Sequence, residues 1–145
     1  METEANNRTA PSRLSVLIVD DDPDLVACLR DLLACDFQVF AATTPDEAWT
    51  LFERHAPRLV IADQRMPGMN GLELLARIKA RDASTVRIIV SGYQDVDIVM
   101  RALNEELVWR FLCKPIDHEQ LMSEVRAARE RIQAGAGVRR GFLGC

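Results

Sequence analysis

The sequence predicts a single α/β domain, built as a doubly wound five-stranded parallel sheet with five helices. Short apolar, β-branched segments alternate five times with longer segments of helical periodicity. Strands and helices that alternate in this way form a parallel sheet with helices on both faces. The chain has 145 residues, of which 48% are hydrophobic and 28% charged, the balance of one folded globular domain.

The five predicted strands are short apolar runs, and four of them stop at a polar residue. They are expected at residues 14–19, 38–42, 58–62, 86–90 and 107–113. The polar residues that follow the first, third, fourth and fifth strands are Asp20-Asp21, Asp63, Ser91 and Lys114. Because the carboxyl ends of parallel strands share one edge of a sheet, we expect these side chains to meet in one cleft.

The five predicted helices carry apolar residues at helical spacing and recognisable capping signals. Asp22 is the expected N-cap of the first helix, with Pro23 at its first position. Thr44 and Glu47 have the spacing of a capping box. The helices are expected at residues 24–34, 44–55, 70–80, 94–106 and 117–134. In the fourth helix, the residues expected to face the core are Val96, Val99, Met100 and Leu103.

The two ends of the chain are expected to lie outside the folded domain, which covers residues 13–134. Residues 1–12 are polar and predict a flexible N-terminal arm, and residues 135–145 contain four glycines and predict a flexible tail or the start of a linker. The net charge of −4 and the lack of a basic run argue against direct nucleic-acid binding. We find no apolar stretch long enough to span a membrane and no signal peptide, so we expect a cytoplasmic protein without membrane contact.

The cysteines do not predict a metal or disulfide framework. The four lie at positions 28, 35, 113 and 145, none forms a Cys-x-x-Cys pair, and the chain has only two histidines. Cys28 and Cys113 lie in apolar runs and are expected to be small buried hydrophobic residues.

The carboxylates at the strand ends, Asp20, Asp21 and Asp63, predict a site for a divalent metal ion. Like charges at short range raise each other's pKa, and a cation relieves that conflict. Mg²⁺ prefers a few carboxylate oxygens together with water. With the amine of Lys114 and the hydroxyl of Ser91 added, the group suits phosphoryl transfer, in which catalysis is mostly positioning and charge neutralisation. One carboxylate could itself be the nucleophile and form an aspartyl phosphate.

Four segments, in order, resemble those of the response-regulator receiver domain (CheY-like) of two-component signal transduction. They are Leu17-Ile-Val-Asp20-Asp21-Asp22-Pro23, Ile61-Ala-Asp63-Gln-Arg65-Met-Pro67-Gly68-Met-Asn-Gly71, Ile89-Val-Ser91-Gly92 and Phe111-Leu-Cys-Lys114-Pro115. The resemblance covers about residues 13–133. It implies the flavodoxin/CheY-like fold, with the strands in the order 2-1-3-4-5.

The resemblance also implies a role for each matching residue of the phosphorylation site. Asp63 would accept a phosphoryl group from a sensor histidine kinase or a histidine phosphotransfer protein. Asp20, Asp21, Asp63 and the backbone carbonyl of Arg65 would hold Mg²⁺, and Lys114 would pair with the phosphoryl oxygens. The domain would then be a self-modifying signalling switch and not a turnover enzyme.

The same resemblance implies how the switch would work. Ser91 would move toward the phosphoryl group, and Phe111 would turn inward as Ser91 moves. Pro115 would follow a cis peptide bond that places Lys114. The face formed by the helix at 94–106, the strand at 107–113 and the helix at 117–134 would then change its affinity for an output domain or a second copy of the chain.

Two large side chains are expected to flank the phosphorylated pocket. Arg65 lies two residues past Asp63, and Tyr93 lies two residues past Ser91. We hypothesise that Arg65 and Tyr93 shield the acyl phosphate from water and lengthen its life. Replacing both with small residues should then speed dephosphorylation.

Two alternative functions fit part of the pattern. The segment Asp22-Pro-Asp24-Leu-Val26 is similar to the nucleophile motif of haloacid-dehalogenase-like phosphatases, with Ser91 and Lys114 as further motifs, although Asp22 falls beyond the expected strand end and Asp63 is left unexplained. The other alternative is a pseudo-receiver, an interaction module that is not phosphorylated, although the acids and the lysine are all present. Repeated hydrolysis of phosphate esters would identify a phosphatase, whereas a receiver accepts one group from an acyl phosphate or a phosphohistidine.

Overall fold

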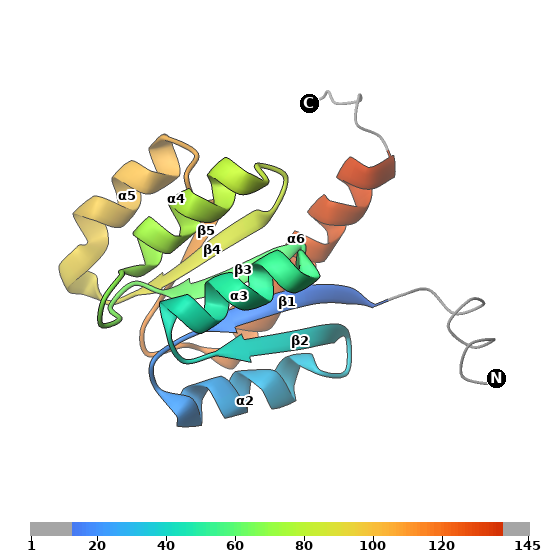
Figure 1. Cartoon of the computed structure of the whole chain (residues 1–145), viewed down its shortest axis with the longest axis horizontal. Coiled ribbons are helices and arrows are strands. Elements are labelled where there is room, and N and C mark those ends of the chain that lie inside the picture. The colour runs from blue at the N-terminus through green and yellow to red at the C-terminus, as the bar shows by residue number, and fades with distance from the viewer. Residues whose placement is uncertain (1–12, 138–145) are drawn as a thin grey trace.

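The computed structural model describes residues 13–137, in which five parallel strands, five α-helices and one short 3₁₀ helix form the fold (Figure 1). The strands are β1 (Leu14–Val19), β2 (Phe37–Ala42), β3 (Leu59–Asp63), β4 (Val86–Ser91) and β5 (Arg110–Cys113). The helices are α2 (Pro23–Leu33), α3 (Pro45–His55), α4 (Gly71–Arg81), η1 (Tyr93–Asp95, 3₁₀), α5 (Val96–Asn104) and α6 (His118–Gly137). The predicted arm at 1–12 lies outside the described residues, as does the predicted tail from residue 138 onward.

The strand order is β2-β1-β3-β4-β5, and all neighbouring strands are parallel. This confirms the predicted fold class and the order that the family resemblance implied. From β1 the chain first adds β2 on one side and then β3, β4 and β5 on the other. The strand order therefore reverses between β1 and β3, and in open α/β sheets ligands bind outside the carboxyl ends at such a reversal.

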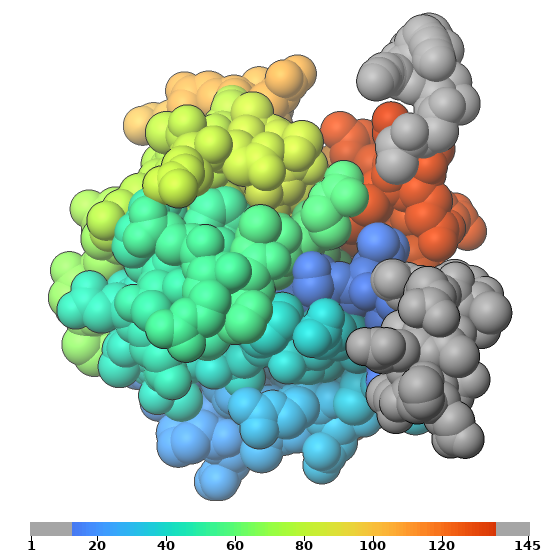
Figure 2. Space-filling view, turned by 45° about the vertical axis from the view of Figure 1, so that its right-hand side comes forward, coloured from blue at the N-terminus to red at the C-terminus, as the bar shows by residue number. Residues whose placement is uncertain are grey.

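Helices cover both faces of the sheet, so its central strands have no polar face. Val16 and Ile18 of β1 pack into the core beneath α2 and α6, whereas Leu17 and Val19 pack into the core beneath α3, α4 and α5. Successive side chains of a strand point to opposite faces, which is why a sheet covered on both sides needs unbroken apolar runs. Figure 2 shows α3 and α4 packed side by side over the second face.

Side-chain caps fix the points at which the loops enter the helices. The carboxylate of Asp22 accepts a hydrogen bond from the backbone N–H of Asp24 at 3.0 Å and so caps α2 as predicted. The hydroxyl of Thr44 accepts from the backbone N–H of Glu47 at 3.1 Å at the start of α3. A full capping box, formed by Asn70 and Glu73, starts α4. These three caps follow the ends of β1, β2 and β3 and hold the loops at the carboxyl edge of the sheet.

Several predicted boundaries need correction, most of all around β5. The strand begins at Arg110 and not at residue 107, and the preceding helix α5 begins at Val96 and ends at Asn104. Glu106 has a left-handed φ of 61°, and the backbone N–H of Leu107 donates to the carbonyl of Ala102 at 2.9 Å. This closure of the helix end keeps Leu107 and Val108 out of the sheet. The last helix, α6, ends at Gly137, three residues past its predicted end at about 134.

Two predictions about burial were wrong. Val96 and Met100 are 37% and 46% exposed, because α5 packs through a narrow stripe that includes Val99 and Ala102. Cys28 is exposed, because the buried stripe of α2 consists of Val26, Leu29 and Leu33. Cys113, the other cysteine expected inside, is only partly buried. Among the helices of residues 13–137, we find none with the length and apolar character that crossing a bilayer requires.

Candidate functional site

The predicted site residues meet at the carboxyl edge of the sheet. Asp63 and Ser91 are the last residues of β3 and β4, and Asp20 and Lys114 directly follow β1 and β5. Backbone pairing continues past the strand ends, since the N–H of Lys114 donates to the carbonyl of Ser91 at 2.9 Å and that of Asp20 donates to Ala42 at 3.2 Å. The sheet itself therefore sets the register of the side chains that form the site.

Lys114 joins the two buried carboxylates of the site. Its Nζ lies 3.0 Å from Oδ1 of Asp63 and 3.4 Å from Oδ2 of Asp20. The other oxygen of Asp20 accepts a hydrogen bond from the backbone N–H of Asp22 at 2.9 Å. Asp20, Asp21 and Asp63 each have a carboxylate oxygen within 4.8 Å of the other two. The structure thus brings together the acids and the lysine that the sequence pattern placed at the strand ends.

The electrostatics of this cluster are not balanced by its own side chains. Burial raises the pKa of Asp63, and the carboxylates of Asp20 and Asp21 raise it further, against the opposing effect of Lys114. Burial also raises the pKa of Asp20. For Lys114, burial lowers the pKa, but its contacts with Asp63 and Asp20 outweigh that effect and leave the pKa raised. A single amine therefore faces three carboxylates, and negative charge is left in excess.

A hard divalent cation fits this donor set. Three carboxylate oxygens within 4.8 Å of one another supply the ligand type and spacing that Mg²⁺ accepts, and Asp21 is exposed at the outer side of the group. Burial is the main cause of the raised pKa values of Asp20 and Asp63, neighbouring carboxylates add to it, and a bound cation would oppose both effects.

A cleft of about 570 Å³ opens beside the carboxylates, lined in part by Asp63, Ser91 and Lys114. Ser91 is only 2% exposed, and its hydroxyl donates to the carbonyl of Gly92 at 3.2 Å. Arg65 and Tyr93, which the sequence analysis placed beside the pocket, also line this cleft. Tyr93 is 78% exposed, so it stands at the mouth of the cleft.

Two further predicted residues lie on β5 and just beyond it. Phe111 is partly buried and packs against the core on the α3, α4 and α5 side of the sheet. The peptide bond between Lys114 and Pro115 is cis.

Gly71 allows α4 to begin directly beside the backbone of Asp63. A Cβ at this position would overlap the carbonyl oxygen of Asp63 and would lie 2.7 Å from Cδ1 of Ile89. The N–H of Gly71 donates to the carbonyl of Gln64 at 3.0 Å, and the side chain of Gln64 accepts from the N–H of Leu72 at 2.9 Å. The start of α4 is thus pinned to the residue that follows Asp63.

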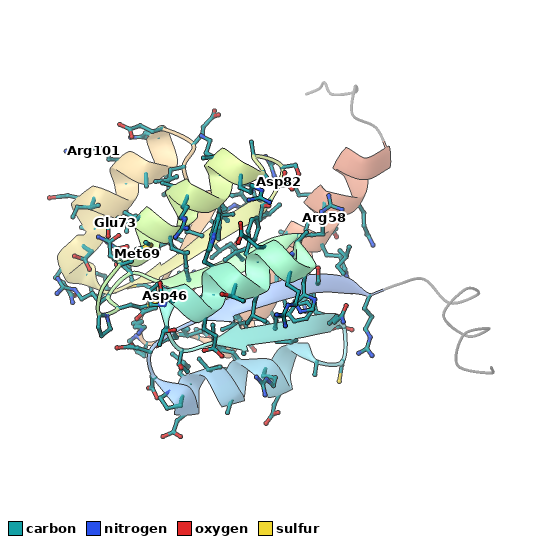
Figure 3. All side chains as sticks on the ribbon, in the orientation of Figure 1. Asp46, Arg58, Met69, Glu73, Asp82 and Arg101 are labelled. Carbon is teal, nitrogen blue, oxygen red and sulfur yellow. The ribbon has the colours of Figure 1, made fainter. Side chains whose placement is uncertain are left out.

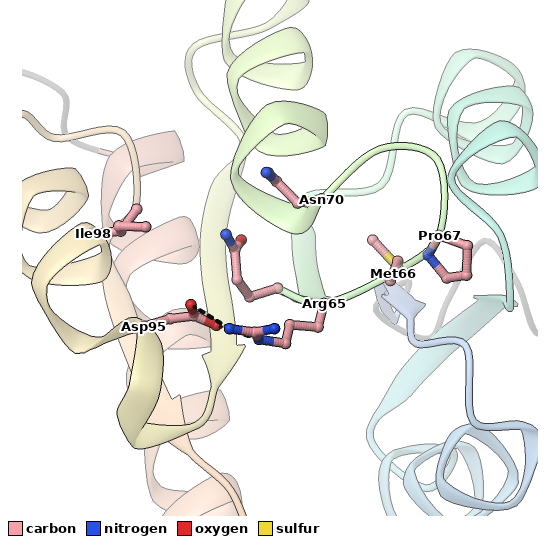
Figure 4. A pocket seen from close by; sticks show the side chains of 7 residues that line it. Arg65, Met66, Pro67, Asn70, Asp95 and Ile98 are labelled. Atoms are coloured by element: carbon pink, nitrogen blue, oxygen red, sulfur yellow. Dashed lines mark hydrogen bonds and ion pairs between the residues drawn. The ribbon is translucent and has the colours of Figure 1, made fainter.

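Sequence reasoning missed one ionic contact at this edge. The guanidinium of Arg65 donates to both oxygens of Asp95, at 3.0 Å from Nε and 3.1 Å from Nη2 (Figure 4). This contact raises the pKa of Arg65. Asp95 is only 7% exposed, although it sits in a segment of polar residues that gives no hint of burial. The one signal that could have found it is its place just past Ser91, within the segment that lines the cleft.

A buried charge at the opposite edge of the sheet was also missed. Arg87, near the amino end of β4, is 7% exposed. Its guanidinium donates to the carbonyls of Leu107 and Thr85, both at 2.7 Å, and to those of Ala83 at 3.2 Å and Glu106 at 3.4 Å. The guanidinium therefore joins the loop before β4 to the loop before β5.

Two curated relatives match most of this chain. The hydrogenase transcriptional regulatory protein HoxA of Cupriavidus necator is 35% identical over 116 residues, which are 80% of this chain and 24% of that protein. The C4-dicarboxylate transport transcriptional regulatory protein DctD of Pseudomonas aeruginosa is 34% identical over 122 residues, which are 82% of this chain and 26% of that protein. The chain thus spans about a quarter of the length of these relatives.

A solved structure and a family pattern agree with these relatives. The signal receiver domain of an HD domain-containing protein from Pseudomonas fluorescens Pf-5 has a TM-score of 0.78 and 32% identity, and the match covers 84% of this chain and 98% of that one. The pattern of the response regulator receiver domain matches residues 16–126. Receiver domains of transcriptional regulators are signalling switches and not classical enzymes. This chain belongs to the family of response regulator receiver domains.

Proposed function

We propose that this domain accepts a phosphoryl group on Asp63 from a phosphohistidine of a sensor histidine kinase or a histidine phosphotransfer protein. The observation that carries the proposal is the contact of 3.0 Å between Lys114 Nζ and Asp63 Oδ1, in a cluster whose carboxylates lie within 4.8 Å of one another. A carboxylate that accepts a phosphoryl group needs positive charge near the phosphoryl oxygens. The amine of Lys114, directly after β5, supplies that charge beside Asp63. We place this domain in the cytoplasm.

The transfer reaction forms one bond and breaks another in line. A carboxylate oxygen of Asp63 forms a bond to phosphorus while the bond between phosphorus and the imidazole nitrogen breaks. The imidazole keeps the electron pair of the broken bond and takes up a proton. Lys114 pairs with the phosphoryl oxygens as they develop charge. Asp20, Asp21, Asp63 and the backbone carbonyl of Arg65 would hold Mg²⁺, which supplies further neutralisation of the phosphoryl charge.

The switch follows from the new charge on Asp63. We expect the hydroxyl of Ser91 to leave the carbonyl of Gly92 for a phosphoryl oxygen, and Phe111 to turn inward as Ser91 moves. The face formed by α5, β5 and α6 then changes its affinity for an output domain or a second copy of the chain. Val96, Ile98 and Met100 of α5 support this choice of face, since they are 37%, 50% and 46% exposed, and apolar surface of this kind favours protein contacts.

Arg65 and Tyr93 remain our candidates for shielding the acyl phosphate. Both line the cleft that contains Asp63. Their side chains are large and stand at its open side, where water would approach the phosphorus. We expect replacement of both with alanine to speed dephosphorylation, which the decay of the phosphorylated mass would measure.

The phosphatase alternative gains no support from the structure. Its nucleophile would be Asp22, but this carboxylate is exposed and caps α2 through the N–H groups of Asp24 and Leu25. An acid occupied in this way, outside the lysine-bound cluster, lacks the positive charge that a phosphoryl group needs.

Intact mass after incubation with Mg²⁺ and acetyl phosphate tests the proposal. Wild type should gain one phosphoryl group that is labile at high pH, and Asp63→Asn should gain none. Asp22→Asn is the matched control, since it keeps the capping geometry, and it should gain the group like wild type. If neither acetyl phosphate nor a phosphorylated histidine kinase modifies the wild type, the proposal is wrong and the pseudo-receiver alternative takes its place.

A further inference from the structure

Arg65 lies between two hollows at the carboxyl edge of the sheet. One is the cleft of about 570 Å³ that contains Asp63 and Lys114, and the other is a hollow of about 510 Å³ that contains Asp95 (Figure 4). The side chain of Arg65 is 65% exposed, so packing does little to fix its position. The contact that fixes it is the two-fold hydrogen bond to Asp95.

This ion pair joins the two segments that carry the proposed phosphoacceptor and the proposed switch residue. Arg65 belongs to the loop that follows Asp63 at the end of β3, and Asp95 ends the turn η1 that follows Ser91 at the end of β4. Parallel hydrogen bonds between a guanidinium and a carboxylate are strong and depend on geometry. The side chain of Asp95 is 9% exposed, and a carboxylate buried to this extent needs a partner cation.

A phosphoryl group on Asp63 would place a second anion within reach of Arg65. The group adds nearly two negative charges and three acceptor oxygens. Among the described residues that line the cleft at Asp63, the two basic side chains are Lys114 and Arg65. Lys114 already contacts both Asp20 and Asp63, whereas the only acidic partner of Arg65 within ion-pair distance in residues 13–137 is Asp95.

We propose that Asp95 is a positioning residue that holds the guanidinium of Arg65 away from Asp63, and that the aspartyl phosphate competes with Asp95 for it. The inference rests on the proposed function. When Arg65 turns to the phosphoryl oxygens, it covers the acyl phosphate and delays hydrolysis. The same movement leaves Asp95 buried without its cation, which loosens η1 and the start of α5. One ion pair thus sets both the lifetime of the phosphorylated state and the freedom of the switch segment.

A double-mutant cycle on the lifetime of the aspartyl phosphate separates this role from a merely structural one. Asp95→Asn keeps the shape of the side chain and removes its charge, so Arg65 should spend more time at Asp63. We expect hydrolysis to slow by about three- to fivefold, the effect of weakening one partly exposed ion pair. Arg65→Gln should speed hydrolysis. In the Arg65→Gln background, Asp95→Asn should have no further effect.

Two additional measurements complete the test. Asp97→Asn, an exposed acid in the first turn of α5, is the matched control and should leave the lifetime unchanged. The NMR signal of the Arg65 Nε–H group should shift on phosphorylation of the wild type and should already be shifted in unmodified Asp95→Asn.

The outcomes distinguish this inference from the proposed function. The proposed competition is wrong if the wild type gains phosphate normally but Asp95→Asn leaves the lifetime of the aspartyl phosphate unchanged. It is also wrong if Asp95→Asn changes that lifetime equally in the wild-type and Arg65→Gln backgrounds. The proposed function survives either result. A wild type that gains no phosphate from any donor overturns both.

Discussion

Two sets of buried charge lie at opposite ends of the same sheet. Figure 3 shows Glu73, at the start of α4, near one end and Asp82, just past its last residue, near the other. At the first end, the carboxylates of Asp20 and Asp63 share one amine. At the other end, the guanidinium of Arg87 donates to four backbone carbonyls.

The comparison shows how buried charges can serve structure in one place and chemistry in another. Both sets are costly, since burial raises the pKa of Asp63 and lowers that of Arg87. The donors of Arg87 are matched by acceptors of its own chain, so this charge fixes two loops and has little capacity left for a ligand. At the other end, Asp20 and Asp63 share the single amine of Lys114, so negative charge is left in excess. This excess of negative charge lies at the end of the sheet where we propose that a cation and a phosphoryl group bind.

The largest loss of stability should come from replacing Arg87, the buried charge whose donors are matched by backbone carbonyls. Arg87→Met leaves the carbonyls of Ala83, Thr85 and Leu107 without their donor, and we expect it to lower the free energy of unfolding by about 3 kcal/mol. Urea denaturation measures the change. The exposed Arg126→Met is the control and should change stability by less than about 0.5 kcal/mol. A loss of under about 1 kcal/mol for Arg87→Met would mean that water satisfies these carbonyls. The contrast between a structural charge at Arg87 and a functional cluster at Asp63 would then be wrong.

The next effect concerns the backbone at the carboxyl edge, which is tightly packed even though its charges are unmatched. Gly71→Ala forces a Cβ against the carbonyl of Asp63, and we expect it to lower stability by about 2 kcal/mol and to slow phosphoryl transfer. Gly92→Ala is the matched control, because a Cβ there meets only the side-chain end of Gln94, which can move. Thermal unfolding of the two variants checks this. Equal stabilities would show that the loop after Asp63 yields without cost.

Removing the charge of Asp63, one of the carboxylates at the carboxyl edge, should stabilise the protein. In the presence of EDTA at neutral pH, we expect Asp63→Asn to raise the free energy of unfolding by about 1 kcal/mol, because burial and the neighbouring carboxylates disfavour the charged form. Asp82→Asn should act in the opposite direction by less than about 1 kcal/mol, since the Ser84 hydrogen bond lowers the pKa of this exposed carboxyl. If both variants destabilise, the carboxyl edge is not under electrostatic strain.

The smallest expected effect is the pH dependence of the stabilisation that Asp63→Asn brings. The pKa of Asp63 in the folded protein is raised above its ordinary value of 3.8, so the unfolded chain loses this proton first as the pH rises. Wild type therefore loses stability as the pH rises from 3.8 through the folded-state pKa, and the full loss is present above it. The stability difference between Asp63→Asn and metal-free wild type should shrink as the pH falls toward 3.8. Urea titrations at a series of pH values measure it, and a difference that grows on acidification would contradict the raised pKa.

The sequence pattern predicted a parallel sheet and the gathering of the candidate site residues at its carboxyl edge, whereas the strand order followed from the family resemblance. Strands covered on both faces require mostly apolar segments, and those of β1, β3 and β4 are visible without any structural knowledge. Because the strands are parallel, the polar residues at or just after their carboxyl ends had to gather at one edge, which brought Asp20, Asp63 and Lys114 together.

The residues that the sequence did not predict depend on tertiary contacts. Arg87 interrupts an apolar strand and gives no sign that two distant loops supply its acceptors. Asp95 is buried and pairs with Arg65, which comes from another loop. Met100 has the spacing of a core residue, yet it lies outside the narrow stripe through which α5 packs. The local sequence pattern shows which residues are apolar or can cap a helix. It does not show which residues from distant segments contact them in the fold.

Lys114 lies 94 positions after Asp20 in the chain and yet contacts its carboxylate, and this separation has a consequence for synthesis. Domains fold as units as they leave the ribosome, from the N-terminus onward. A nascent chain that has not yet exposed β5 holds the acids of the pocket without their counter-charge. The cluster of acids and lysine is therefore complete only once β5 has joined the sheet.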